Sequence, residues 1–151
     1  MFNPFKKNFS LKGAVALYQA DRLYRNRFRR FGAHHSGVHW NSSDEQKLRF
    51  NLLCSAINSR LKNPKLSIAD LGCGYGLLYS YLQDRGFIGT YYGYERCSNM
   101  LSYARKQFPY SNAHFIHASS VQHLVDYTLI SGCFNLKMNA PTDLWWEWVK
   151  Q

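Results

Sequence analysis

The residues with the clearest chemical signature lie in the segment IADLGCGYG, at positions 68–76. A short apolar run ends at Asp70, and Gly72, Gly74 and Gly76 follow it at alternate positions. A glycine-rich turn between a strand and a helix places free backbone N–H groups and a helix N-terminus beside a ligand that can approach the main chain closely. We therefore expect a flat or anionic group to bind against this turn.

The spacing of the glycines disfavours two common cofactor motifs. The dinucleotide fingerprint G-x-G-x-x-G needs its third glycine at position 77, which is Leu77. A P-loop needs a Gly-Lys-Ser or Gly-Lys-Thr sequence, which this chain lacks. The turn therefore favours neither NAD nor ATP.

The turn resembles the first motif of the class I S-adenosylmethionine-dependent methyltransferases, an acidic residue followed by G-x-G-x-G. A second acidic residue, Glu95 in YYGYER, ends the next apolar segment 25 positions after Asp70. The resemblance implies that Asp70 and the glycines face the methionine part of S-adenosylmethionine, that Glu95 accepts from the ribose hydroxyls, and that Arg96 and Cys97 flank the adenine. The cofactor-binding residues that it implies are Asp70, Gly72, Cys73, Gly74, Gly76, Glu95, Arg96, Ser119 and Ser131.

The chain departs from the family pattern after its third and fourth expected strands. Many members carry an aspartate after the third strand, where this chain has Ser119 and Ser120. The Asn/Asp-Pro-Pro-aromatic motif of nucleic-acid amino methyltransferases would fall near Asn135, but the sequence there is FNLK. Methylation of adenine or cytosine nitrogens is therefore disfavoured, and no catalytic residue is assigned.

The resemblance covers nearly the whole chain and reaches FGAHHSGVHWNSSDEQKLRF upstream and SGCFNLK downstream. The family fold continues beyond a fourth strand and helix, whereas this sequence stops at DLWWEWVKQ. We therefore expect a truncated methyltransferase fold in which the fourth strand would be an edge. Homodimerisation through that edge or through the C-terminal helix with Trp145, Trp146 and Trp148 would cover it.

Turn-forming residues and the periodicity of apolar residues predict the helices and strands that position these residues. Apolar segments at 66–71, 90–95, 114–118 and 127–132 indicate strands, and helices are expected near 76–85 and 98–108. This alternation predicts an α/β, Rossmann-like, mostly parallel sheet, and the family order of its strands is 3-2-1-4.

The upstream part is expected to be helical. Leu17, Ala20, Tyr24, Phe28 and Phe31 recur at helical spacing within residues 17–31. A glycine- and serine-rich loop follows at 32–43, and a capping box of Ser43 and Gln46 opens a helix that stops at Asn63-Pro64. We expect an N-terminal helical extension at 1–63 and a cofactor-binding core at 64–151, within one compact domain.

The net charge of +10 is concentrated at the N-terminus. Residues 1–33 hold eight Lys/Arg and one Asp (+7), and residues 34–151 hold eleven Lys/Arg and eight Asp/Glu (+3). Arg22, Arg25 and Arg29 form a separate ridge on the first helix, which we call the arginine ridge. It can contact phosphates of nucleic acid or an anionic substrate, although an ordinary solvated face is the favoured interpretation.

The composition indicates which classes of protein the chain can belong to. With 46% hydrophobic residues the chain can bury a sizeable core, and no apolar run approaches the roughly 20 residues that span a bilayer. We expect a soluble, cytoplasmic protein with no membrane partner and reduced cysteines, because the four cysteines include no C-x-x-C pair. His34, His35 and His39 could ligate a metal, but a substrate-facing or exposed loop is favoured.

Methyl transfer from S-adenosylmethionine to an unidentified, most simply small-molecule, acceptor is the function that the resemblance implies. Catalysis would consist chiefly of aligning an already activated methyl group. Two alternatives stay open: a non-catalytic binding module that acts through self-association or a partner, and an RNA-directed methyltransferase that uses the arginine ridge.

Overall fold

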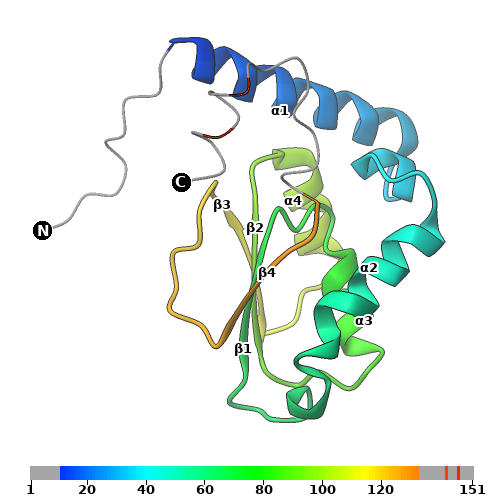
Figure 1. Cartoon of the computed structure of the whole chain (residues 1–151), viewed down its shortest axis with the longest axis vertical. Coiled ribbons are helices and arrows are strands. Elements are labelled where there is room, and N and C mark those ends of the chain that lie inside the picture. Colours follow the sequence, from blue (N-terminus) through cyan, green and yellow to red (C-terminus); the bar gives the residue numbers. More distant parts are fainter. Residues whose placement is uncertain (1–10, 133–141, 143–145, 147–151) are drawn as a thin grey trace, which may run out of the picture.

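The computed structural model describes residues 11–132, 142 and 146 of the chain. Helices and strands alternate after an N-terminal helical part (Figure 1). The elements are α1 (Leu11–Phe31), η1 (His35–Val38), α2 (Ser43–Ser55), η2 (Asn58–Arg60), β1 (Ser67–Leu71), α3 (Leu77–Gln83), β2 (Thr90–Glu95), α4 (Ser98–Gln107), β3 (Ala113–His117) and β4 (Tyr127–Ile130).

The four strands form one parallel sheet in the order β3-β2-β1-β4, which confirms the predicted fold class and strand order. The register places Ile68 of β1 beside Tyr91 of β2 and Tyr127 of β4, so alternate residues of each strand share a face. α3 and α4 contribute buried side chains to a single core on one face of the sheet. Tyr79 of α3 packs its ring there against Tyr91 and Phe115.

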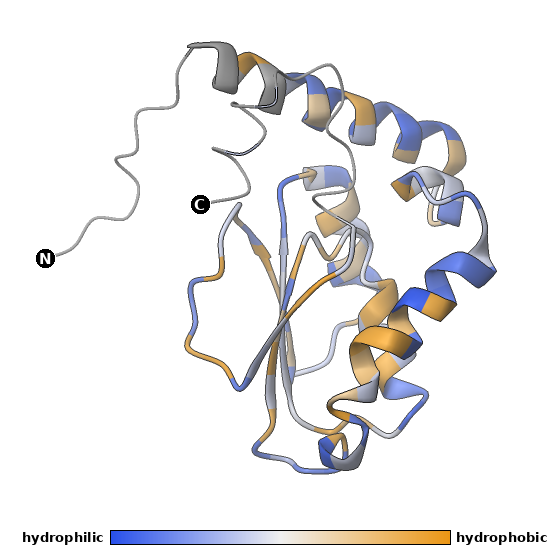
Figure 2. Ribbon diagram, viewed as in Figure 1, coloured by the Kyte–Doolittle hydropathy of each residue, from blue (hydrophilic) through white to orange (hydrophobic). Residues whose placement is uncertain are grey.

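Apolar residues are concentrated in the strands and in the neighbouring parts of α2 and α3, while polar residues dominate α1 (Figure 2). This distribution agrees with a core between the sheet and the helices that follow its strands. No helix in the described part of the chain is long and apolar enough to cross a membrane.

α1 crosses above the sheet at the end where the strands terminate (Figure 1). Phe28 anchors it in a second buried cluster with Tyr75, Cys97 and Met100. The helix begins at Leu11, earlier than expected, and Phe31 departs from the predicted apolar stripe because its ring is 40% exposed. The arginine ridge is exposed, as expected for a face of the helix away from its apolar stripe.

The start of α2 differs from the expected capping box by one residue. Ser42, not Ser43, is the N-cap, and its Oγ accepts from the N–H of Glu45 at 3.1 Å. Gln46 is therefore not part of the cap. α2 also ends at Ser55, and the chain from there to residue 63 contains the short turn η2 instead of a continuous helix.

Several expectations fall outside the described residues. Cys133, Asn135, Trp145 and Trp148 belong to this group, together with the C-terminal helix that was expected to contain the tryptophans. Trp146, which is described, is exposed.

Candidate functional site

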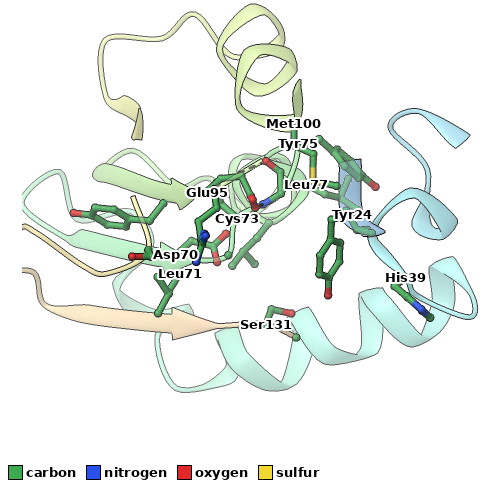
Figure 3. Close-up of a pocket in the computed structure, with 18 of the residues that line it drawn as sticks. Tyr24, His39, Asp70, Leu71, Cys73, Tyr75, Leu77, Glu95, Met100 and Ser131 are labelled. Atoms are coloured by element: carbon green, nitrogen blue, oxygen red, sulfur yellow. Dashed lines mark hydrogen bonds between the residues drawn. The ribbon is translucent and has the colours of Figure 1, made fainter. Parts of the chain in front are cut away.

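A cavity of about 520 Å³ lies where the strands end, roofed by α1 and by the segment from η1 to α2. Its volume is within the range of about 300–1,000 Å³ that is typical of small-molecule sites. In a sheet of this order, β2 and β3 follow β1 on one side and β4 lies on its other side, so the strand order reverses between β1 and β4; such switch points are where parallel α/β sheets bind ligands. Asp70, Cys73 and Glu95 lie on the sheet side of the cavity, and Tyr24 and His39 face them from the roof (Figure 3).

The glycine turn is tied to the end of β2 instead of presenting free N–H groups, which corrects the expectation from sequence. The N–H groups of Gly72 and Cys73 both donate to the carbonyl of Tyr94, at 2.9 and 3.1 Å. The N–H of Gly74 donates to Glu95 Oε2 at 2.9 Å, and that of Gly76 donates to the Cys73 carbonyl. These four N–H groups are therefore already used within the protein, and the turn contributes to a ligand site mainly through its shape.

The turn needs glycine for internal reasons as well. Gly72, Gly74 and Gly76 all have positive φ, between 57° and 88°, a conformation that glycine adopts at little cost. A Cβ on Gly76 would lie 2.8 Å from Phe108, and one on Gly74 would lie 3.3 Å from Val38 in the roof. Packing against neighbouring side chains, and not the approach of a ligand, accounts for the glycine at position 76.

Asp70 is the most unusual polar group in the cavity. Its side chain is 1% exposed, Oδ2 accepts from the Tyr91 hydroxyl at 2.6 Å, and Oδ1 has no partner among the described residues. Burial raises the pKa of Asp70 from 3.8 to about 7; the Tyr91 hydrogen bond opposes this rise, and the nearby Glu95 adds to it. The carboxyl group is therefore ready to accept a positively charged or hydrogen-bonding ligand group.

Glu95, at the end of β2, links the turn to the next helix. Its Oε2 accepts from the Gly74 N–H and its Oε1 accepts from the Cys97 N–H at 2.7 Å. Burial raises the pKa of Glu95, and these backbone hydrogen bonds counteract that rise. A carboxylate has about four lone-pair positions, so each oxygen retains capacity for a further donor.

Arg96 connects the sheet to the roof. Its guanidinium donates to Asp21 Oδ2 of α1 at 2.8 Å, and both residues line the cavity. The ion pair therefore holds α1 across the mouth of the site.

Eight of the nine predicted cofactor-binding residues line this one cavity, and Gly76 is the exception. Ser119 lies in the loop after β3, and Ser131 follows β4, with a buried Oγ that has no partner among the described residues. Cys97, which the resemblance placed beside the adenine, is buried with Phe28 and Met100 instead of lining the cavity.

The roof residues were not identified from the sequence as parts of a site. Ala20, Tyr24 and Phe50 were recognised only as packing positions, and Gln46 was assigned to a helix cap. Asp21, Val38 and Trp40 were not singled out as individual residues.

The three histidines of the loop do not form a cluster of metal ligands. His34 accepts from the Ser36 N–H, His35 Nδ1 lies 3.1 Å from the Trp40 carbonyl, and His39 lines the cavity. Across the described ranges, no three His, Cys, Asp or Glu side chains gather in an arrangement that could hold a metal ion.

Comparisons with known proteins agree with this architecture. Residues 69–134 match the family described as a methyltransferase domain. A relative from Mycobacterium tuberculosis, named "Putative methyltransferase Rv1506c", is 40% identical over 80 residues, which make up 52% of this chain and 48% of that protein. The crystal structure of the plantazolicin methyltransferase BpumL in complex with triazolic desmethylPZN analog and SAH has a TM-score of 0.53 at 21% identity, over 93% of this chain and 53% of that one.

The structural likeness to BpumL shows the fold, and the chain spans about half the length of each of these two proteins. The family match begins within β1 and includes the glycine turn, Glu95 and the whole remainder of the sheet. Residues 69–134 therefore resemble a methyltransferase domain, and the described parallel sheet has the fold of one.

Proposed function

We propose that the cavity binds S-adenosylmethionine and that the domain transfers its methyl group to a small-molecule acceptor. The observation that carries this proposal is the pair of buried, unpartnered oxygens, Asp70 Oδ1 and Ser131 Oγ, which line one cavity next to the glycine turn. Buried polar groups without partners cost free energy, so their presence in a cavity favours a ligand that completes their hydrogen bonds.

The residues fit the groups of this cofactor. The ammonium of the methionine part would donate to Asp70, and the ribose hydroxyls would use the remaining lone pairs of Glu95. Ser119 and Ser131 supply hydroxyls that can either donate or accept. Arg96, whose guanidinium is paired with Asp21, would flank the adenine through the flat face of that pair.

When bound, S-adenosylmethionine would supply an activated methyl group on its sulfonium, which the lone pair of an acceptor could take while the sulfur–carbon electron pair stays on sulfur and the acceptor's proton goes to water. The chain contributes by binding and orientation, since α1 and η1 close the cavity above the turn and exclude much of the solvent.

Calorimetry with S-adenosylhomocysteine tests this proposal. We expect binding to the wild-type protein and weaker binding to Ser131→Ala, because the variant removes a hydroxyl that faces the cavity. Ser102→Ala is the matched control, since Ser102 is exposed on α4 outside the cavity. No binding at millimolar ligand would contradict the proposal.

An RNA-directed methyltransferase is the second candidate, because the exposed arginine ridge lies on the same helix that roofs the cavity. Transfer of labelled methyl from S-adenosylmethionine into RNA, instead of into small molecules of a cell extract, would favour it. Binding of S-adenosylhomocysteine without transfer to either would favour the non-catalytic binding module.

A further inference from the structure

We propose that Gln46 selects the methyl acceptor, and that this acceptor presents an uncharged hydroxyl or amino group on an apolar or aromatic body. The inference rests on the proposed function, because it assigns the part of the same cavity that lies away from the glycine turn. It adds a specificity-determining residue and a substrate class.

Gln46 is a largely buried residue whose side chain forms no hydrogen bond within the described part of the chain. Its side chain is 5% exposed and lines the cavity, and no described residue forms a hydrogen bond with it. The helix cap, which could have used the amide, is formed by Ser42 and the N–H of Glu45. The amide atoms are not among the fully buried side-chain atoms without a partner, so they remain accessible from the cavity, where a ligand can supply the hydrogen bond that the described residues do not.

Several aromatic side chains line the same cavity as Gln46. Phe50 lies one helical turn further along α2 on the same face, and both residues line the cavity. Trp40 joins them from the segment before α2, and the ring of Tyr24 projects from α1 into the space between the sheet side and His39 (Figure 3). These side chains suit a ligand with an apolar or aromatic body and a small number of polar groups.

The charges of the cavity disfavour an anionic acceptor. Its lining carries the carboxyl groups of Asp21, Asp70 and Glu95, while the guanidinium of Arg96 is already paired with Asp21. Among the described lining residues a carboxylate or phosphate on the acceptor would therefore meet no unpaired arginine or lysine, and only the imidazole of His39 could serve it. A protonated amine has no lone pair to offer the methyl carbon. An uncharged O–H or N–H group matches the amide of Gln46, which can both donate and accept.

The test uses the full chain saturated with S-adenosylhomocysteine and two probes that share a ring, 2-phenylethanol and phenylacetate. We expect 2-phenylethanol at millimolar concentration to shift the side-chain amide signal of Gln46 in a nitrogen–proton NMR spectrum, and phenylacetate to leave it unshifted. The signal is assigned by its loss in Gln46→Leu. That variant should bind 2-phenylethanol at least about fivefold more weakly, the effect of one lost hydrogen bond.

Two further measurements separate this role from a structural one. Gln46→Leu should bind S-adenosylhomocysteine as the wild type does, and its melting temperature without ligand should be unchanged or higher, because no described hydrogen bond is lost. Gln107→Leu, on the exposed end of α4, is the matched control.

Several outcomes would overturn the inference. They are a melting temperature of Gln46→Leu well below that of Gln107→Leu, undiminished affinity of Gln46→Leu for 2-phenylethanol, no shift with 2-phenylethanol, and a preference for phenylacetate. Normal binding of S-adenosylhomocysteine together with any of these results would overturn only the role of Gln46. Failure of the wild type to bind S-adenosylhomocysteine would overturn the proposed function as well.

Discussion

Replacement of Asp70 by asparagine should stabilise the protein and at the same time weaken its binding of the cofactor. In the folded state the pKa of Asp70 is raised from 3.8 to about 7, chiefly by burial. The unfolded chain therefore loses this proton at lower pH than the folded chain does, and ionisation of Asp70 opposes folding increasingly between these two values. Below the lower value the carboxyl is protonated in both states, and the penalty is absent.

The size of the penalty follows from the shift. A rise of about three units, at about 1.4 kcal/mol per unit, amounts to about 4 kcal/mol above pH 7 as an upper bound. Asparagine is uncharged, and its carbonyl can still accept from the Tyr91 hydroxyl. We therefore expect Asp70→Asn to raise the free energy of unfolding by about 2 to 4 kcal/mol at about pH 8 and by little at about pH 4.

Binding should change in the opposite direction. If the ligand ammonium pairs with ionised Asp70, the affinity of the wild type for S-adenosylhomocysteine should rise about tenfold from about pH 6 to about pH 8, as the ionised fraction rises. Asp70→Asn should bind more weakly and show no such rise.

Urea unfolding and calorimetry at several pH values measure both effects. Asp84→Asn, at the exposed end of α3, is the matched control. A stability difference between wild type and Asp70→Asn that does not grow from acid to alkaline pH would refute the reasoning about burial. Equal affinity of the two proteins at alkaline pH would refute the role of the carboxylate in binding.

Four other expectations can be checked directly. Glu95→Gln should lower the free energy of unfolding by about 1 to 3 kcal/mol in urea titrations and weaken cofactor binding in calorimetry, because the amide cannot accept at both positions where Gly74 and Cys97 donate. Gly76→Ala should lower the melting temperature more than Gly32→Ala, since both positions have positive φ but only at Gly76 would a Cβ meet another side chain; equal losses would contradict this. Replacement of the arginine ridge by glutamine should leave cofactor affinity unchanged, and an unchanged salt dependence of RNA binding would favour a solvated face. β4 is an outer strand of the described sheet, so light scattering after size exclusion should reveal a discrete dimer, and a stable monomer at high concentration would contradict this.

Local patterns in the sequence were sufficient to predict the strands at the core of the fold. The apolar runs around Ile68, Tyr91 and Leu129 predicted strands within one or two residues of their observed bounds. The central strands β1 and β2 are largely buried, as a continuous apolar segment predicts, whereas in β4 only Leu129 is buried. The order of the strands came from the family resemblance of the glycine turn and Glu95. Boundaries governed by a single side chain were less predictable, as the shift of the α2 cap to Ser42 shows.

The candidate site was predictable on its sheet side, since residues just after parallel strands must meet at one edge of the sheet. By itself the sequence thus determined the parallel sheet, the glycine turn at the end of β1 and the acidic groups beside it, Asp70 and Glu95. Only the tertiary structure decided that the turn's N–H groups bond to Tyr94 and Glu95, that Asp21 pairs with Arg96, and that Gln46 is buried at the cavity wall. These features depend on how α1 and α2 pack over the sheet, and contacts between residues far apart in the chain leave no periodic signal in either partner.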